Sequence, residues 1–569
     1  MKRIVSLLIF ACLIFLFACP IKAPTEEAHV KVFSGVVPHH LLAKDIIEDF
    51  YLKLSNKAKP ETIILLSPDH FHQCEINETD LIMPESPVIQ DINIDIEGIS
   101  ELKQALSILQ DDSTVFLDHG VMNHFPYIKK YFPEVSLIPM VVSQNLTEDN
   151  AKSITEWIFD NLKSETIIIA SVDFSHYLPK EIAAIHDIKS KRVLMNFETE
   201  QFENIEVDSW QSLYIARYFS ELQGINSYTL IAEKNSNDYF PDERLSETTS
   251  YFSIIFGDNL EQHLTKIEDR TLAFVGDIML DRNVEKLMTE KGLIYPFEEI
   301  KSILKGFDYT VGNLEGIISE NKQPYETNSL MFSFRKEAAQ ILKESHFNIM
   351  NLANNHSLNF GNKALNFTRT ILNKAEVSSF GDPLNFTDKY ILKNENFVFL
   401  GFNLTYGYVQ QNLIDAIAKV SNENANAFVI LYLHWGNEYE EKSSPSQREL
   451  AHALIDRGVD LIIGSHPHVV QEIEKYHSGI RNKDALIFYS LGNFVFDQYF
   501  SKETQEGLMV GFTKSTGSLQ FTLIPVKLTN SQPQLMAQEE KSDFLSNLAR
   551  KSSEELRKQI EKGEIDLNN

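Results

Sequence analysis

The chain has 569 residues, of which 43% are hydrophobic, and a formal net charge of −28 at pH 7. This length leaves room for several domains of ~100–200 residues, and the apolar content is typical of a globular rather than a disordered protein. The strong negative charge argues against a nucleic-acid partner, because phosphate binding requires a basic face.

The first segment, MKRIVSLLIFACLIFLFAC, has the basic start, apolar run and small terminal residues of a targeting signal. Residues 16–19 resemble the lipobox of bacterial lipoproteins, which implies lipidation of Cys19 and a membrane-anchored protein of the bacterial cell envelope, outside the cytoplasm. Phe17 is bulkier than the usual residue, so simple signal cleavage or an uncleaved anchor is the alternative. Once Cys19 is lipidated, only Cys74 stays as a free thiol beyond the signal, and no internal disulfide can form.

Two blocks follow the signal, at residues 30–258 and 271–528, and the polar stretch GDNLEQHLTKIEDR joins them. Both blocks alternate short apolar strands with amphipathic helical stretches. In the second block, AFVILYLHWG, SQRELAHALIDRG and VDLIIGSH predict a strand, a helix and a strand. We therefore predict two α/β domains. The charged residues 529–569 predict a partly helical tail that is solvated or loosely docked.

Apolar strands of the first block end in histidines and aspartates. The segments VVPHH, SPDHFH, DHGVMNH, SVDFSHY and AIHDI supply them: His39, His40, Asp69, His70, His72, His119, His124, Asp173, His176 and His186. Ligands gather at the carboxyl ends of strands in open α/β sheets, so this collection predicts a metal site. The alternative is a vestigial domain whose histidines only form hydrogen bonds.

The motifs VVPHH, SPDHF and SVDFSHY resemble the Memo family, also called AmmeMemoRadiSam system protein B, over residues 30–257. That fold is similar to the LigB type of non-haem iron dioxygenase. The resemblance implies that His39 and His70 bind a metal and that Asp173 and His176 line the site. The family often adds a cysteine ligand, and Asp208 occupies that position here. Two histidines and a carboxylate would suit Fe(II) or another single metal.

The second block repeats the pattern of polar residues at strand ends. They stand in the motifs GD, GNLE, NNH, HWG, GSHPH and SLGNF: Asp277, Asn313, Glu315, Asn354, Asn355, His356, His434, His466, His468 and Asn493. Taken singly, each residue could be a cap, a turn or a satisfied surface group. Together they offer oxygen and nitrogen ligands suited to zinc, manganese or iron, so we predict a divalent metal centre.

The order of these motifs resembles the CapA family of capsule and poly-γ-glutamate synthesis proteins, which is similar to the calcineurin-like metallophosphoesterases. The resemblance implies a sandwich fold over residues 271–528, with one or two metals held by Asp277, Glu315, Asn355, His434, His466 and His468. It further implies that His356 acts as a general acid. One departure is Met279, which stands where the wider superfamily has a histidine; the first metal position is therefore one ligand short.

Three further residues are candidates around this centre. Arg335 in FSFRKE could bind an anionic group of the substrate, although a surface role is equally compatible with the sequence. Glu438 in HWGNEYE and Asn493 are candidates for contacts with the metal ligands. Pro467 fixes its own φ between His466 and His468, which favours a turn that lets both imidazoles reach the same edge.

These predictions favour an envelope-anchored, metal-dependent hydrolase-like protein with two α/β domains, the first Memo/LigB-dioxygenase-like and the second a calcineurin-like sandwich. Its expected role is the synthesis, tailoring or anchoring of a capsule or poly-γ-glutamate-type anionic surface polymer. Two alternatives remain: a general envelope phosphatase or phosphodiesterase with a phosphorylated substrate, and a non-catalytic polymer-binding scaffold. The membrane is expected as a partner through the N-terminal anchor, and nucleic acid is not.

Overall fold

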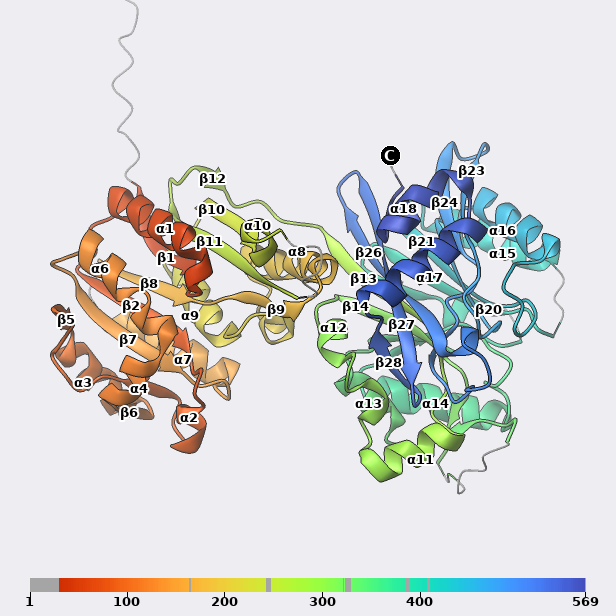
Figure 1. Cartoon of the computed structure of the whole chain (residues 1–569), viewed down its shortest axis with the longest axis horizontal. Coiled ribbons are helices and arrows are strands. Elements are labelled where there is room, and N and C mark those ends of the chain that lie inside the picture. Colours follow the sequence, from red (N-terminus) through yellow and green to blue (C-terminus); the bar gives the residue numbers. More distant parts are fainter. Residues whose placement is uncertain are drawn as a thin grey trace, which may run out of the picture.

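The computed structural model describes residues 30–567, apart from 163–164, 242–246, 321, 323–328, 385–387 and 407–409. The predicted signal segment, including Cys19, lies outside the described residues. None of the helices in the described ranges combines the length and the hydropathy of a membrane-spanning segment. The described chain forms two α/β lobes, which lie side by side in Figure 1. The predicted fold class is therefore confirmed.

The N-terminal domain is built on one mixed sheet with the strand order β12-β10-β11-β1-β8-β2-β7-β3-β6, to which β4, β5 and β9 add. Its strands are β1 (Lys31–Val37), β2 (Thr62–Pro68), β3 (Leu81–Met83), β4 (Val88–Ile89), β5 (Ile92–Ile94), β6 (Ile108–Gln110), β7 (Ser136–Val142), β8 (Thr166–Ser171), β9 (Phe174–Leu178), β10 (Ser227–Asn235), β11 (Thr248–Asp258) and β12 (Gln262–His263). The neighbours β1, β8, β2 and β7 run parallel, so their carboxyl ends meet at one edge.

Helices cover this sheet, which explains why β2 and β8 are apolar runs that are buried along their whole length. The helices are α1 (Lys44–Lys57), α2 (Gln73–Ile76), α3 (Ile96–Ala105), α4 (Asp112–Leu117), α5 (His119–Met122), α6 (Phe125–Tyr131), α7 (Glu148–Asn161), α8 (Lys180–Asn196), α9 (Trp210–Leu222) and α10 (Ser236–Tyr239).

The C-terminal domain is a sandwich of two sheets. The first has the order β18-β17-β14-β13-β26-β27-β28, with β25 and β29 at its side, and the second has the order β19-β20-β21-β22-β24-β23. The first comprises β13 (Arg270–Ile278), β14 (Tyr309–Leu314), β17 (Ile349–Asn351), β18 (Ser378–Phe380), β25 (Asn493–Val495), β26 (Glu506–Ser515), β27 (Ser518–Thr529), β28 (Gln532–Leu535) and β29 (Glu564–Asp566). The second comprises β19 (Leu392–Asn394), β20 (Phe397–Asn403), β21 (Phe428–His434), β22 (Leu461–Ser465), β23 (Ile473–Ser478) and β24 (Lys483–Phe488).

The facing sides of these two sheets form one apolar core, in which Phe274 and Val311 of the first sheet meet Ile430 and Ile463 of the second. A small pair, β15 (Ile317–Ile318) and β16 (Ser333–Phe334), lies beside them. The helices of the domain are α11 (Arg282–Lys291), α12 (Lys301–Lys305), α13 (Ala338–Glu344), α14 (Gly361–Lys374), α15 (Gln410–Glu423), α16 (Pro445–Asp456), α17 (Gln538–Lys551) and α18 (Arg557–Lys562).

The C-terminal tail is part of this core, which corrects the expectation of a solvated or loosely docked segment. Leu545 and Leu548 of α17, Ile560 of α18 and Ile565 of β29 are buried in the cluster between the sheets. Strand β29 also pairs with β27. The charged residues of the tail face outward from an apolar stripe. The high charge content therefore wrongly indicated a solvated segment.

Helix α8 belongs to the N-terminal domain by sequence but packs into the C-terminal domain. Its Ile182 and Ile185 lie in the same buried cluster as Phe307 and Met509. Lys189 donates hydrogen bonds to the carbonyl oxygens of Lys305 and Phe307, both at 2.9 Å. Through these contacts, a helix of the N-terminal domain is anchored in the core of the C-terminal domain.

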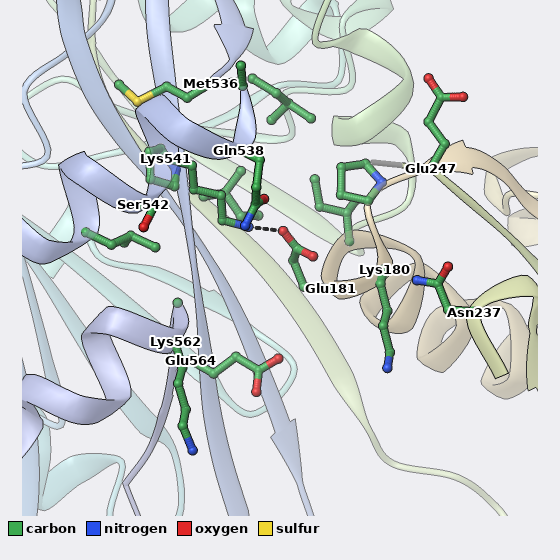
Figure 2. A pocket seen from close by; sticks show the side chains of 18 of the residues that line it. Lys180, Glu181, Asn237, Glu247, Met536, Gln538, Lys541, Ser542, Lys562 and Glu564 are labelled. Carbon is green, nitrogen blue, oxygen red and sulfur yellow. Dashed lines mark hydrogen bonds and ion pairs between the residues drawn. The ribbon is translucent and has the colours of Figure 1, made fainter. Parts of the chain in front are cut away.

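Two more contacts of α8 reach the far domain. Arg192 Nη1 lies 2.6 Å from Asp308 Oδ2, and both side chains are buried. The same Asp308 oxygen accepts a hydrogen bond from the backbone N–H of Thr271 at 2.8 Å, near the start of β13. Nearby, a cavity of about 770 Å³ separates the domain surfaces, and an ion pair between Glu181 and Lys541 crosses it (Figure 2).

Candidate metal centres

The first side of the C-terminal site is the shared edge of the parallel strands β13, β14 and β17. Asp277 stands near the end of β13, and Glu315 directly follows β14. Asn313 Nδ2 donates to Asp277 Oδ1 at 2.7 Å and lies 3.3 Å from His434 Nδ1. The Asn313 amide therefore ties a carboxylate of one sheet to an imidazole of the other.

The turn after β17 adds three polar side chains, each with a different environment. Asn354 donates to the carbonyl oxygen of Leu314 at 2.8 Å, so it holds the turn against β14. Asn355 Oδ1 lies 2.8 Å from His434 Nε2. His356 Nε2 lies 3.6 Å from Glu315 Oε1, and its ring stacks on Phe332 with 4.1 Å between centroids.

The second sheet contributes the histidines at the ends of β21 and β22. His434 closes β21, and its ring lies 4.8 Å from that of His466. His466 and His468 have φ values of 94° and 57°, in the left-handed region that costs a non-glycine residue roughly 1–3 kcal/mol. The strained turn around Pro467 brings both imidazoles to the site edge.

Hydrogen bonds hold this turn in place. The backbone N–H of His466 donates to Asp277 Oδ2 at 3.1 Å. His468 Nδ1 lies 2.9 Å from Asn493 Oδ1, whose amide nitrogen donates to the carbonyl oxygen of Thr504 at 2.9 Å. Because Asn493 presents its oxygen, it holds the proton on Nδ1 of His468 and leaves Nε2 directed at Glu315, 3.7 Å from Oε1.

The electrostatics of this cluster fit a bound cation. Glu315 is fully buried, and within the described part of the chain neither of its oxygens has a hydrogen-bond partner. Burial and the Asp277 carboxylate raise the pKa of Glu315 well above its ordinary value. Although burial opposes it, the carboxylates of Glu315 and Asp277 raise the pKa of His468 to about 9. Positive charge is therefore favoured at this position.

The ligand atoms of Asp277, Glu315 and His434 lie within 4.8 Å of one another, as do those of Glu438, His466 and His468. The two groups offer carboxylate oxygens and imidazole nitrogens, which is the donor set of zinc, manganese and iron sites. Burial and the neighbouring His466 and His468 keep the pKa of His434 well below its ordinary value, so its imidazole is neutral, as a ligand must be.

Arg335 and Met279 do not contribute ligands to this cluster. Arg335 is engaged away from the cluster: its Nε lies 3.0 Å from Glu285 Oε1 and its Nη2 donates to Thr289 Oγ1 at 2.9 Å, both on α11. Met279 is fully buried in the domain core, and its sulfur accepts the backbone N–H of Asp281 at 3.1 Å. The thioether serves packing at the place where a further imidazole ligand is missing.

The N-terminal site lies at the carboxyl ends of β1, β2 and β8, with His39 at its centre. His39 Nε2 is 3.2 Å from His70 Nε2 and 3.4 Å from both Asp173 Oδ2 and Asp208 Oδ2. His176 Nε2 lies 4.0 Å from Asp208 Oδ2. His70 and Asp208 thus both lie beside His39, but in different groups. Among the described residues, the ligand atoms that lie within 4.8 Å of one another belong to His39, His70 and His119 on one side and to His39, Asp173 and Asp208 on the other.

This site also fits a metal. Asp208 Oδ1 is buried without a hydrogen-bond partner among the described residues. Burial and the neighbouring Asp173 raise the pKa of Asp208 well above its ordinary value, and burial raises that of Asp173 to about 7. Burial, followed by His70 and His119, lowers the pKa of His39 well below its usual range. Neutral imidazoles beside paired carboxylates are the state that binds a cation.

Residues with no assigned role in the sequence interpretation also take part. His119 starts α5, its ring lies 3.8 Å from that of His70, and its nitrogen can join His39 and His70 as a ligand. Asp118 holds His70, with 3.1 Å between Oδ1 and Nδ1. Both stand in the motif DHGVMNH. The sequence therefore showed the motif, but it did not show that these side chains point toward His70. In the C-terminal site, Arg282 lies over the ring of Phe332, 5.0 Å from its centroid, and Phe332 also stacks on His356.

Comparisons with known proteins match each of the two domains. The family model described as "Bacterial capsule synthesis protein PGA_cap" matches residues 271–498, and that described as "Memo-like protein" matches residues 16–213. The capsule biosynthesis protein CapA of Bacillus anthracis is 33% identical over 290 residues, which cover 47% of this chain and 69% of the relative. The PGA biosynthesis protein CapA of Bacillus subtilis is 31% identical over 46% of this chain and 72% of its own. A MEMO1 family protein of Caldivirga maquilingensis is 25% identical, over 41% of this chain and 85% of its own.

Proposed function

The chain belongs to the CapA family and carries a Memo-like domain in front of its CapA domain. From this premise we propose that it is an envelope-anchored, metal-dependent hydrolase-like protein. It acts in the synthesis, tailoring or anchoring of a capsule or poly-γ-glutamate-type anionic surface polymer. The observation that carries the enzymatic part is the buried Glu315 carboxylate. It has no protein hydrogen-bond partner within the described residues and faces the imidazoles of His356 and His468.

The residues that would hold one or two divalent metals, Mn, Zn or Fe, are Asp277, Glu315, Asn355, His434, His466 and His468, with Glu438 at the exposed side. Metals bound there would lower the pKa of a bound water and neutralise anionic oxygens of the substrate. Amide side chains of the protein orient the proposed ligands: Asn313 holds the Asp277 carboxylate, and Asn493 holds the ring of His468. Preorganised ligands of this kind suit hydrolysis of a phosphate ester or activation of a carboxyl group.

His356 is the proposed proton carrier. Its Nδ1 lies 3.0 Å from Asn359 Oδ1, an oxygen that also accepts the backbone N–H of Phe332. The Nδ1 atom therefore carries the proton, and its N–H donates a hydrogen bond to Asn359 Oδ1. Burial lowers the pKa of His356, so the ring is neutral and Nε2 presents a lone pair toward Glu315. In this state His356 must take a proton from a group at the site before it can act as the general acid that the sequence suggested.

In the N-terminal domain, His39, His70 and Asp208 are the proposed ligands of a single metal, Fe or another. Support comes from two groups of close ligand atoms that share His39, one with His70 and His119 and the other with Asp173 and Asp208. A metal there would supply redox or Lewis-acid chemistry. The role of the chain's own residues is to orient the ligands: Asp118 holds His70, and Ser171 Oγ lies 3.3 Å from His39 Nδ1. We infer a binding or tailoring function for this domain on the same surface polymer.

Turnover by the full-length protein tests the enzymatic proposal. Protein loaded with Mn²⁺, Zn²⁺ or Fe²⁺ is assayed on an aryl phosphate and on poly-γ-glutamate, whose length is followed by gel filtration. We expect turnover of one of them that EDTA and Glu315→Gln abolish. Glu285→Gln is the matched control, because Glu285 is also a buried glutamate of this domain but pairs with Arg335. Polymer binding without any turnover, unaffected by EDTA, would identify a scaffold instead.

The anchor is tested separately by Cys19→Ser. Loss of the lipid and release of the protein from the membrane fraction would support the lipoprotein proposal. A mature N-terminus elsewhere with no lipid, measured by mass spectrometry, would contradict it.

A further inference from the structure

A cavity of about 480 Å³ lies one residue away from the metal ligand His468. It opens between α17, the segment after His468, and two loops. Its lining consists of Glu441, Lys442, Val469, Val470, Lys502, Glu503, Glu506, Phe544, Asn547, Leu548, Arg550 and Lys551. Lys502, Arg550 and Lys551 lie beyond residue 498, where the match to the capsule synthesis family model ends. The cavity is therefore assembled largely from parts that the family model does not describe.

Four basic side chains gather here in a chain whose net charge is −28. Two have structural partners: Lys551 donates to the carbonyl oxygen of Val470 at 2.6 Å, and Lys502 lies 3.3 Å from Glu506. The other two, Lys442 and Arg550, are exposed, and neither forms an ion pair with a carboxylate in the described part of the chain; Arg550 Nη2 donates a hydrogen bond to the neutral Asn547 Oδ1. Two cations are thus available to a negatively charged ligand.

Two exposed loops lead from the metal site to this cavity. Loop 437–442 begins beside Glu438, whose carboxylate lies within 4.8 Å of the ligand atoms of His466 and His468, and ends at Lys442. Loop 498–503 runs along it and ends in the cavity wall. Four residues of extended chain span at most ~14 Å, so the Cα atom of Lys442 lies within that distance of the Cα atom of Glu438.

Tyr439 joins the two loops. Its ring lies 5.1 Å from that of Phe500, and its hydroxyl accepts a hydrogen bond from Gln498 Nε2 at 3.3 Å. Its backbone N–H donates to the carbonyl oxygen of Pro467, the residue between the two ligand histidines, at 2.8 Å. Tyr439 and Phe500 remain 45% and 66% exposed, so both rings are accessible to a chain that runs between the metal site and the cavity.

We propose that this cavity is a second anion-binding subsite, which takes a carboxylate of a polyanionic chain whose nearer residue lies at the metal centre. Lys442 and Arg550 bind the carboxylate, Tyr439 and Phe500 support the chain between the two points, and Lys551 holds the wall. This inference rests on the proposed function, because it takes the metal centre as the first contact. The acidic Glu441, Glu503 and Glu506 beside the cations keep the attraction weak enough for the chain to move along.

Binding of γ-linked glutamate oligomers of increasing length to the metal-loaded full-length protein tests the proposal by calorimetry. Affinity should rise with length until both points are engaged, because a second contact on the same molecule is intramolecular. Lys442→Glu/Arg550→Glu should lower the affinity for the long oligomer about tenfold, since two exposed charge contacts are lost. Affinity for a single glutamate should be unchanged. The matched control is Arg557→Glu/Lys558→Glu, which reverses two exposed charges of the same domain on α18, outside the cavity.

The outcomes separate this inference from the proposed function. Turnover of a small aryl phosphate should be equal in the subsite variant and the wild type, because that substrate cannot reach the cavity. Equal oligomer affinity in the subsite variant and the wild type, with metal-dependent turnover intact, would overturn the subsite alone. Equal weakening by the control variant would also overturn it, because it would show a general charge effect. Absence of metal-dependent turnover in every variant, with the length dependence retained, would overturn the enzymatic proposal but support the subsite.

Discussion

Replacing Glu315 by glutamine should change the stability of the C-terminal domain in opposite directions with and without metal. The carboxylate is fully buried beside Asp277, and its oxygens accept no hydrogen bond from the described residues. A buried carboxylate without a partner is costly, so it either binds a cation or takes up a proton. Glutamine removes the charge and keeps the shape. The metal-free protein should therefore gain stability, whereas the metal-bound protein should lose it.

The expected loss in the presence of metal follows from the loss of one ligand. Even residues that only support a ligand typically account for ~10–100-fold in metal affinity, which corresponds to about 1.4–2.7 kcal/mol. For a domain of this size, 1 kcal/mol shifts the unfolding midpoint by roughly 2–4 °C. Glu315→Gln should thus lower the midpoint by about 3–10 °C in excess Mn²⁺. In EDTA the midpoint should stay the same or rise.

Scanning calorimetry of the full-length protein in excess Mn²⁺ and in EDTA measures both midpoints. Glu285→Gln serves as the control and should lower both midpoints alike, because its ion pair with Arg335 does not involve the metal. If Glu315→Gln destabilises the protein equally in both conditions, the carboxylate is an ordinary structural group. The assignment of Glu315 as a ligand would then be wrong.

Three further variants address the other parts of the account. His356→Ala should retain the metal, measured by elemental analysis, and lose ~10²–10⁴-fold in turnover; unchanged turnover would reject its role in proton transfer. Asp208→Asn should lower the metal content of the N-terminal site and leave the C-terminal site loaded; full occupancy of both would remove Asp208 from the ligand set. Leu548→Ala should lower the free energy of unfolding by about 2–5 kcal/mol in urea titration, because Leu548 is buried in the core. A loss well below 1 kcal/mol would instead favour a loosely docked tail.

The sequence predicted where polar side chains gather because parallel strands end at a common edge. Polar residues at the ends of neighbouring parallel strands, such as Asp277 near the end of β13 and Glu315 directly after β14, then lie near one another. The match to Memo-like and CapA family models confirms the family resemblance drawn from these motifs. Orientation was not predictable: His119 and Asn313 stand in the strand-end motifs, but only the fold shows that His119 faces His70 and that Asn313 links Asp277 to His434.

Long-range contacts were harder to predict from the sequence. His186 was counted among the histidines of the N-terminal site, but this was wrong: it lies on α8, and its Nε2 is 2.9 Å from the carbonyl oxygen of Ile303 in the other domain. Lys189 and Arg192 of the same helix likewise find their carbonyl and carboxylate partners more than 100 residues away. Arg335 likewise resembled an anion-binding residue, whereas its partner Glu285 stands 50 residues before it. In the tail, Leu545 and Leu548 are spaced as one helical face, but the surrounding charges hid that pattern.

Anomalous X-ray diffraction at the manganese, iron and zinc edges, from crystals of the full-length protein, tests the central claim most directly. We predict at least one anomalous peak among Asp277, Glu315, His434, His466 and His468, within bonding distance of Glu315. A second peak is expected beside His39. A structure with no metal at the C-terminal position, and with Glu315 protonated or hydrogen-bonded to protein groups alone, would contradict the account.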